Sequence, residues 1–168
     1  MSLALRLICN FEKIFFLFCL AVFILTAFLL KDQTLLNVDE AFFAAVATYL
    51  NDTGLLPLEG SRDSKPPGIF FIYQLIFMIS TPYDMSAVRI FSYLWLFLVA
   101  FVTYFSSRAF LSREVSWFAT GLFLINVLTT NSLAAFKTEH GLLLPFAISV
   151  LFFLNFLKSG RLIFLFLQ

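Results

Sequence analysis

The chain has few charged residues, one histidine and two cysteines, the residue types that form metal sites, disulfides and nucleic-acid-binding surfaces. Only 12% of its 168 residues are charged, and the net charge of +1 excludes the basic surface that nucleic-acid binding needs. The single histidine, His140, cannot build a histidine metal site by itself. The two cysteines, Cys9 and Cys19, fit neither a disulfide framework nor a metal pair, and we expect them to be thiols that face lipid.

Apolar residues are abundant instead. They make up 61% of the chain, and phenylalanine alone occurs 25 times. A soluble domain of this size could not bury so much apolar surface, so the excess must face lipid. The composition therefore predicts an all-α, polytopic membrane protein that forms a single transmembrane domain over residues 1–168.

Four uncharged runs are long enough to be membrane spans. A hydrocarbon core of about 30 Å needs about 20 helical residues. The first run follows Arg6 and Lys13 without a small-residue cleavage site, so we interpret it as an uncleaved anchor. Residues 162–168 resemble the beginning of a fifth helix that the chain does not complete. The four runs are residues 14–30, 90–107, 115–136 and 141–157.

The apolar segment 68–81 is too short to cross the membrane comfortably, since fourteen helical residues reach only about 21 Å. If it lies on the surface, the positive-inside rule gives a cytoplasmic N-terminus and places Asp39, Lys65 and Glu139 together on the outer side. Six of the eleven basic residues then occupy the cytoplasmic side: Arg6, Lys13, Arg108, Arg113, Lys158 and Arg161.

The outer loop 31–84 is too long for a plain connector, and its pattern predicts two amphipathic surface helices. Asn37 and Glu40 have capping-box spacing, and Gly54 gives a stop. The stripe on the first helix consists of Phe43, Val46 and Leu50. Pro66 and Pro67 begin the second helix at its first turn.

Most polar motifs of this loop and of the span ends have a purely structural explanation when each is taken alone. Asp39 and Glu40 suit the positive end of a helix dipole. Lys65 before two prolines can be an interfacial lysine, and Arg89 can extend to lipid headgroups. Glu139 is less ordinary, because an acid at the start of the fourth span is costly at membrane depth and is usually functional.

Taken in order, these motifs resemble one superfamily. An acidic pair follows the first span, a Lys-Pro-Pro-Gly sequence at residues 65–68 opens a surface helix, Arg89 starts the second span, and Glu139 starts the fourth. This order resembles the polytopic GT-C glycosyltransferases that use lipid-phosphate-linked sugars, the superfamily of protein O-mannosyltransferases and aminoarabinose-to-lipid A transferases. The resemblance covers residues 1–161.

The resemblance implies an inverting transfer of sugar from a polyprenyl-phosphate donor to an acceptor hydroxyl at the outer face of a bacterial inner membrane. Asp39, with Glu40 beside it, would be the catalytic acid pair, with Asp39 as the general base. Lys65, Arg62 and Arg89 would face the phosphate. Glu139 would position the acceptor or share a divalent cation with Asp39, and metal use stays open.

The chain covers about a third of the dozen spans typical of that superfamily. We therefore expect a fragment or one piece of a split enzyme, inactive without a C-terminal part. The alternative is a small non-catalytic membrane protein, such as an assembly factor or a transporter subunit. That alternative predicts outer acids paired with neighbours and no cavity, and the reading frame downstream of the gene would separate the two hypotheses.

Overall fold

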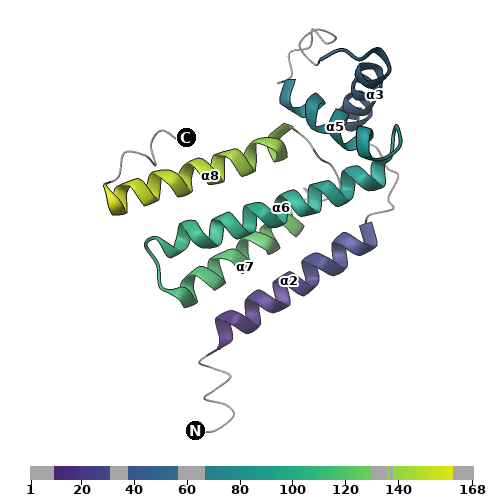
Figure 1. Cartoon of the computed structure of the whole chain (residues 1–168). Coiled ribbons are helices and arrows are strands. Elements are labelled where there is room, and N and C mark those ends of the chain that lie inside the picture. Colours follow the sequence, from purple (N-terminus) through teal and green to yellow (C-terminus); the bar gives the residue numbers. More distant parts are fainter. Residues whose placement is uncertain (1–9, 31–37, 57–66, 130–135, 137, 161–168) are drawn as a thin grey trace.

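The computed structural model describes residues 10–30, 38–56, 67–129, 136 and 138–160, and within these ranges the regular structure is helical throughout (Figure 1). The all-α prediction is confirmed for this part of the chain. The described helices are α2 (Phe11–Leu30), α3 (Val38–Thr53), α5 (Pro67–Ile79), α6 (Met85–Arg108), α7 (Arg113–Thr129) and α8 (Thr138–Ser159).

Three of the described helices, α2, α6 and α8, are long and apolar enough to cross a membrane, which indicates a membrane protein. They contain 20, 24 and 22 residues and include the predicted spans 14–30, 90–107 and 141–157. Helix α7 has 17 described residues and α5 has 13. The third predicted span, residues 115–136, is therefore not established, and residues 162–168 lie outside the described part.

The four longest helices, α2, α6, α7 and α8, run side by side and alternate in direction (Figure 1). Helix α7 packs against both α2 and α6, and α6 packs against α8 on its other side. Helices α3 and α5 pack on each other at one end of this bundle, where α5 contacts α6 and α8. The opposite end holds the beginning of α2 and α7 and the end of α6 and α8.

Two separate apolar cores result from this arrangement. The bundle core lies between α2, α6 and α7 and consists of Cys19, Phe23, Tyr93, Leu96, Ala100 and Leu124. The end core lies under α3 and α5, where the rings of Phe43 and Phe70 meet edge to face with centroids 5.5 Å apart. Phe43 and Leu50 of the predicted stripe are buried there, and Val46 is partly buried against the same core.

The helix ends follow local sequence signals. Gly54 ends α3 with a left-handed φ of 69°, a conformation that glycine adopts without strain. Pro67 is the first residue of α5, as predicted. Asp84 caps α6, and its carboxylate accepts a hydrogen bond from the Ala87 N–H at 3.1 Å. Asn37 lies outside the described residues, so the capping box on α3 stays a prediction.

Two expectations from the sequence are wrong. The third uncharged run does not stay helical to Phe136, since that residue lies outside any helix, just before α8. Cys19 does not face lipid, because it is fully buried where α2 meets α7. The contact is close because Gly121 has no side chain: a Cβ there would lie 3.4 Å from Cys19 Sγ and 2.9 Å from Phe15 Cε1.

Candidate functional site: a clamped peptide between four segments

The acidic first turn of α3 points one carboxylate inward. Glu40 falls on the buried face of α3, the same face as Phe43, Ala44 and Ala47, and its exposed fraction is 0%. Asp39 is turned by about 100° from Glu40, as successive residues of an α-helix are, and it is only partly buried. The two neighbouring acids therefore have different surroundings.

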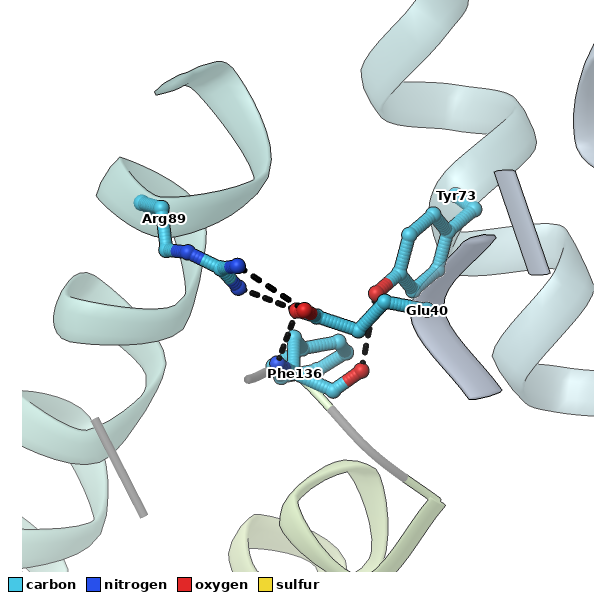
Figure 2. A network of polar contacts seen from close by, with 4 residues as sticks. All are labelled: Glu40, Tyr73, Arg89 and Phe136. Atoms are coloured by element: carbon cyan, nitrogen blue, oxygen red, sulfur yellow. Dashed lines mark hydrogen bonds and ion pairs between the residues drawn. The ribbon is translucent and has the colours of Figure 1, made fainter. Parts of the chain in front are cut away.

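Arg89 of α6 meets Glu40 in the interior. Its exposed fraction is 1%, and its Nη2 donates to Glu40 Oε2 at 2.8 Å while its Nη1 contacts Glu40 Oε1 (Figure 2). This is the bidentate geometry in which a guanidinium binds a carboxylate most strongly. The buried pair rules out, for this structure, the alternative that Arg89 extends to lipid headgroups.

Both backbone groups of Phe136 are held at the same place. Its N–H donates to Glu40 Oε1 at 2.9 Å, and its carbonyl accepts a hydrogen bond from the Tyr73 hydroxyl of α5 at 2.8 Å (Figure 2). Residues from α3, α5 and α6 thus grip one peptide segment that leads into α8. We call Glu40, Arg89, Tyr73 and Phe136 the peptide clamp.

The aromatic ring of Phe136 is also packed among neighbouring side chains. It is fully buried, and its neighbours are the rings of Phe91 at 5.4 Å, Trp95 at 6.2 Å and His140 at 6.3 Å between centroids. The Trp95 indole also donates to the His140 carbonyl at 2.8 Å, which ties the first turn of α8 to α6. The approach to α8 is therefore fixed by aromatic packing as well as by hydrogen bonds.

The charges in the clamp compensate one another. A buried carboxylate is costly unless it is paired and hydrogen-bonded, and Glu40 has both kinds of partner. Burial raises the pKa of the Tyr73 phenol, and the nearby Glu40 carboxylate raises it further, while Arg89 opposes both. The Tyr73 hydroxyl consequently keeps its proton and remains a donor to Phe136.

The clamp brings predicted site residues from different parts of the chain into one region. Glu139 follows Phe136 by three residues, lies in the first turn of α8 and is exposed. With about 3.8 Å between successive Cα atoms, the Cα of Glu139 lies within about 16 Å of Glu40 Oε1. Lys65 and Arg62 lie outside the described residues, so the structure does not place them.

Glu40 and Arg89, two of the predicted site residues, form an ion pair with each other. Both oxygens of Glu40 and both terminal nitrogens of Arg89 are engaged in the buried pair. In this arrangement both side chains are buried and bind each other. Asp39 and Glu139 are the two acids of the prediction that have some exposure to solvent.

A cavity of about 240 Å³ lies between the N-terminal halves of α5 and α8, beside Trp95 of α6. Gly68 and Trp95 line it, together with Thr138 and Gly141 of α8. The Thr138 hydroxyl is buried without a hydrogen-bond partner among the described residues. Two of its lining residues, Thr138 and Gly141, flank Glu139 in the first turn of α8.

Metal binding has limited support from side chains alone. In the described ranges, no three His, Cys, Asp or Glu side chains gather as potential metal ligands. Asp39 and Glu139 are the carboxylates that the prediction offers, and Ca²⁺ or Mg²⁺ takes six or more oxygen ligands. A divalent cation here would draw most of its ligands from substrate oxygens and water.

Sequence reasoning did not find two members of the clamp. Tyr73 sits in an almost wholly apolar helix, where a hydroxyl group is a weak signal of a buried partner. Phe136 gave no signal, because its contribution is made by backbone atoms that every residue has.

Comparison with models of known protein families, with curated protein sequences and with solved structures gives no match for this chain.

Proposed function

We propose that this chain carries the site of a membrane glycosyltransferase that moves a sugar from a polyprenyl-phosphate donor to an acceptor hydroxyl at the outer membrane face. The observation that carries the proposal is the hydrogen bond from the Phe136 N–H to Glu40. It joins the acidic start of α3 to the segment that leads to the acidic start of α8. These are the two acidic positions on which the resemblance to GT-C enzymes depends.

The proposed chemistry needs one base and one cation. Asp39, half-exposed at the start of α3, takes the proton from the acceptor hydroxyl as it attacks the sugar carbon. Lys65, with Arg62 nearby in sequence, stabilises the charge that develops on the departing phosphate. Glu139 orients the acceptor. A single displacement of this kind inverts the configuration at the sugar carbon.

The peptide clamp supplies the geometry for this proposal. Glu40 and Arg89 do not react in it; they fix α3 against α6 and hold the approach to α8. Precise placement of reacting groups accounts for a large part of enzymatic rate acceleration. In our proposal the buried pair is therefore a positioning element for Asp39 and Glu139.

The proposed topology has four spans, α2, α6, α7 and α8, with a cytoplasmic N-terminus and with α3 and α5 on the outer surface. It is supported by the basic residues Lys13, Arg108, Arg113 and Lys158, which lie at the bundle end opposite to α3 and α5 (Figure 1). In a background without Cys9 and Cys19, single cysteines at positions 52 and 112 should react with an impermeant maleimide from opposite sides. Labelling from the same side would contradict the topology.

The catalytic proposal is tested by comparing two identical substitutions on α3. Asp39→Asn keeps the size of the side chain but removes the base, so sugar transfer should fall about 10²–10⁴-fold. Asp52→Asn, on an exposed residue at the far end of the same helix, should leave transfer unchanged. Transfer from a labelled polyprenyl-phosphate sugar is measured in membranes of cells that carry each variant in the gene's natural place. Equal transfer by Asp39→Asn and wild type would contradict the role of Asp39.

One observation favours the non-catalytic alternative, an assembly factor or transporter subunit. Glu40, one of the outer acids, is paired with a neighbour as that alternative predicts. The cavity of about 240 Å³ beside α8 argues the other way. If the alternative holds, Asp39→Asn should change neither transfer nor growth, whereas disruption of the clamp should release a co-purifying membrane partner.

A further inference from the structure

A cavity of about 260 Å³ lies where α6 and α7 meet, and Phe16 of α2 adds one further wall. We call it the α6–α7 cavity. Its lining on α6 runs from Phe97 to Phe105, and helical steps of 1.5 Å give this stretch a length of about 12 Å. One leaflet of a hydrocarbon core is about 15 Å thick. The cavity therefore fits within a single leaflet, the one beside the last turn of α6.

The cavity opens at the side of the bundle. Phe97, Phe101 and Phe105 line it and are also exposed, so their rings border its opening. Helix α6 is long and apolar enough to cross a membrane, which puts these rings in contact with the hydrocarbon of the bilayer. A lipid chain can therefore enter the cavity from the bilayer.

One polar group in the lining lacks a partner. Trp117 packs on the rings of Phe16 and Tyr104, with centroids 4.6 and 4.4 Å away. Its indole N–H is buried and has no hydrogen-bond partner among the described residues. The Thr120 hydroxyl, by contrast, donates to the Ser116 carbonyl at 2.9 Å. Because an unpaired buried donor is costly, an occupant that brings an acceptor oxygen is favoured over plain hydrocarbon.

Each helix that lines the cavity carries an exposed basic residue about one turn beyond it, toward the bundle end opposite to α3 and α5. Residues three or four positions apart share one face of a helix, so each basic residue lies on the same face as a lining aromatic residue. The pairs are Lys13 with Phe16, Arg108 with Tyr104, and Arg113 with Trp117.

Positive charge predominates at this end of the bundle. Lys13 and Arg108 also bind the nearby oxygens of Asn10 and Leu111, but each has further N–H groups to donate. Among the described residues, the charged side chains of this end are the basic Lys13, Arg108, Arg113 and Lys158 and the acidic Glu12 and Glu114. The end of the cavity next to the last turn of α6 therefore favours an anionic group.

We infer that the α6–α7 cavity binds an acyl chain of an anionic glycerophospholipid. The ester carbonyl of that chain accepts a hydrogen bond from the Trp117 indole, and the phosphate lies among Lys13, Arg108 and Arg113. In a glycerophospholipid the ester lies between the phosphate and the chain, as the indole lies between the basic residues and the apolar lining. The inference does not rest on the proposed sugar transfer, because it concerns the bundle end opposite to the peptide clamp.

Quenching of tryptophan fluorescence by brominated lipids tests the inference. The chain has two tryptophans, so Trp95→Phe leaves Trp117 as the only one. This variant is placed in phosphatidylcholine vesicles with increasing fractions of either phosphatidylglycerol or phosphatidylcholine that is brominated on its acyl chains. One basic residue strengthens binding to anionic lipid about fivefold, so half-maximal quenching should need an at least fivefold lower fraction of the phosphatidylglycerol. Equal quenching by the two lipids would overturn the inference.

A pair of charge variants in the same background separates the cavity from the general charge of this end. Arg113→Gln should reduce the preference for phosphatidylglycerol about fivefold. Lys158→Gln removes the same charge from α8, which does not line the cavity, and should leave the preference nearly unchanged. Equal effects of the two variants would overturn the inference. Weak quenching by both lipids that falls further at high protein-to-lipid ratio would assign this face to a second copy of the chain, and would overturn it too.

Native mass spectrometry needs no replacement of Trp95 and decides if that variant does not fold. In mild detergent the wild-type protein should retain one phosphatidylglycerol in preference to phosphatidylcholine. Trp117→Phe keeps an aromatic ring without the N–H and should retain about three- to tenfold less of it. Tyr83→Phe, an exposed position before α6, is the control and should retain as much as the wild type. Equal retention by Trp117→Phe and the wild type would contradict the inference.

Discussion

Helix α6 carries an arginine near each end, and the two have opposite surroundings. Arg89 is buried and forms a bidentate ion pair with Glu40, a residue 49 positions earlier in the chain. Arg108 is in the last turn and exposed, and its guanidinium donates to the Leu111 carbonyl at 2.9 Å, three residues away. The same residue type therefore joins distant segments at one end of the helix and finishes a local turn at the other.

The two apolar cores differ in the same way. The bundle core is made of apolar side chains packed between long helices, with close contact at Gly121. The end core surrounds a charged pair and the gripped peptide of Phe136. Apolar packing tolerates small rearrangements, whereas a buried ion pair has one good geometry. Of the two cores, the end core is therefore the one whose geometry is more constrained.

The largest expected effect comes from removing one partner of the buried pair. Arg89→Ala leaves the Glu40 carboxylate buried without its counter-charge, which typically costs about 3–5 kcal/mol of unfolding free energy. Arg108→Ala removes an exposed arginine from the same helix and should change stability by less than about 0.5 kcal/mol. Unfolding in mixed SDS and mild-detergent micelles, followed by tryptophan fluorescence, measures both variants.

A double replacement separates charge from packing. Replacing Glu40 and Arg89 together by leucine removes both charges, so stability should recover much of the loss seen with Arg89→Ala. The Phe136 N–H would still lose its acceptor, and the recovery should therefore be incomplete. Equal losses for Arg89→Ala and Arg108→Ala would show that the ends of α6 do not differ as the structure implies.

A smaller effect is expected in the bundle core, from a side chain at Gly121. A Cβ at that position would lie 2.9 Å from the Phe15 ring, so Gly121→Val requires the Phe15 side chain or helix α2 to shift. Overpacking of this kind typically costs about 1–3 kcal/mol. Gly141→Ala is the control, because a Cβ there meets its nearest neighbour at an ordinary 3.8 Å. Thermal unfolding in detergent should distinguish the two variants, and equal melting temperatures would contradict close packing at Gly121.

The sequence predicted the helices better than it predicted their contacts. Uncharged runs and helix signals such as Gly54 and Pro67 act locally, so they located α2, α3, α5, α6 and α8 closely. The end of the third run was misjudged because an apolar phenylalanine looks the same in a span and in a buried peptide. Cys19 was misplaced because its burial depends on Gly121, about a hundred residues away.

The site was predicted only in its outline. Asp39, Glu40, Arg89 and Glu139 were chosen from their order along the chain, and the structure gathers Glu40, Arg89 and the approach to Glu139 in one region. The mutual pairing of Glu40 and Arg89 could not be foreseen, because two charges 49 residues apart pair only when the fold brings them together. Lys65 and Arg62 stay predictions.

The smallest expected effect is a pH dependence that arises at Tyr73. Because burial raises its pKa, the folded protein keeps the phenolic proton above pH 10, where an unfolded tyrosine, with a pKa of about 10, loses it. The folded state then binds more protons than the unfolded state. The contribution of Tyr73 to the free energy of unfolding is therefore complete below about pH 10 and declines by about 1.4 kcal/mol per pH unit above it.

Tyr73→Phe should remove that part of the alkaline decline, at the cost of about 1 kcal/mol at neutral pH for the lost bond to Phe136. Tyr83→Phe, at an exposed position, should keep the decline of the wild type. Unfolding measured from pH 8 to 11 in all three proteins gives the answer, and identical slopes for Tyr73→Phe and the wild type would mean that Tyr73 is not held in the clamp as the structure places it.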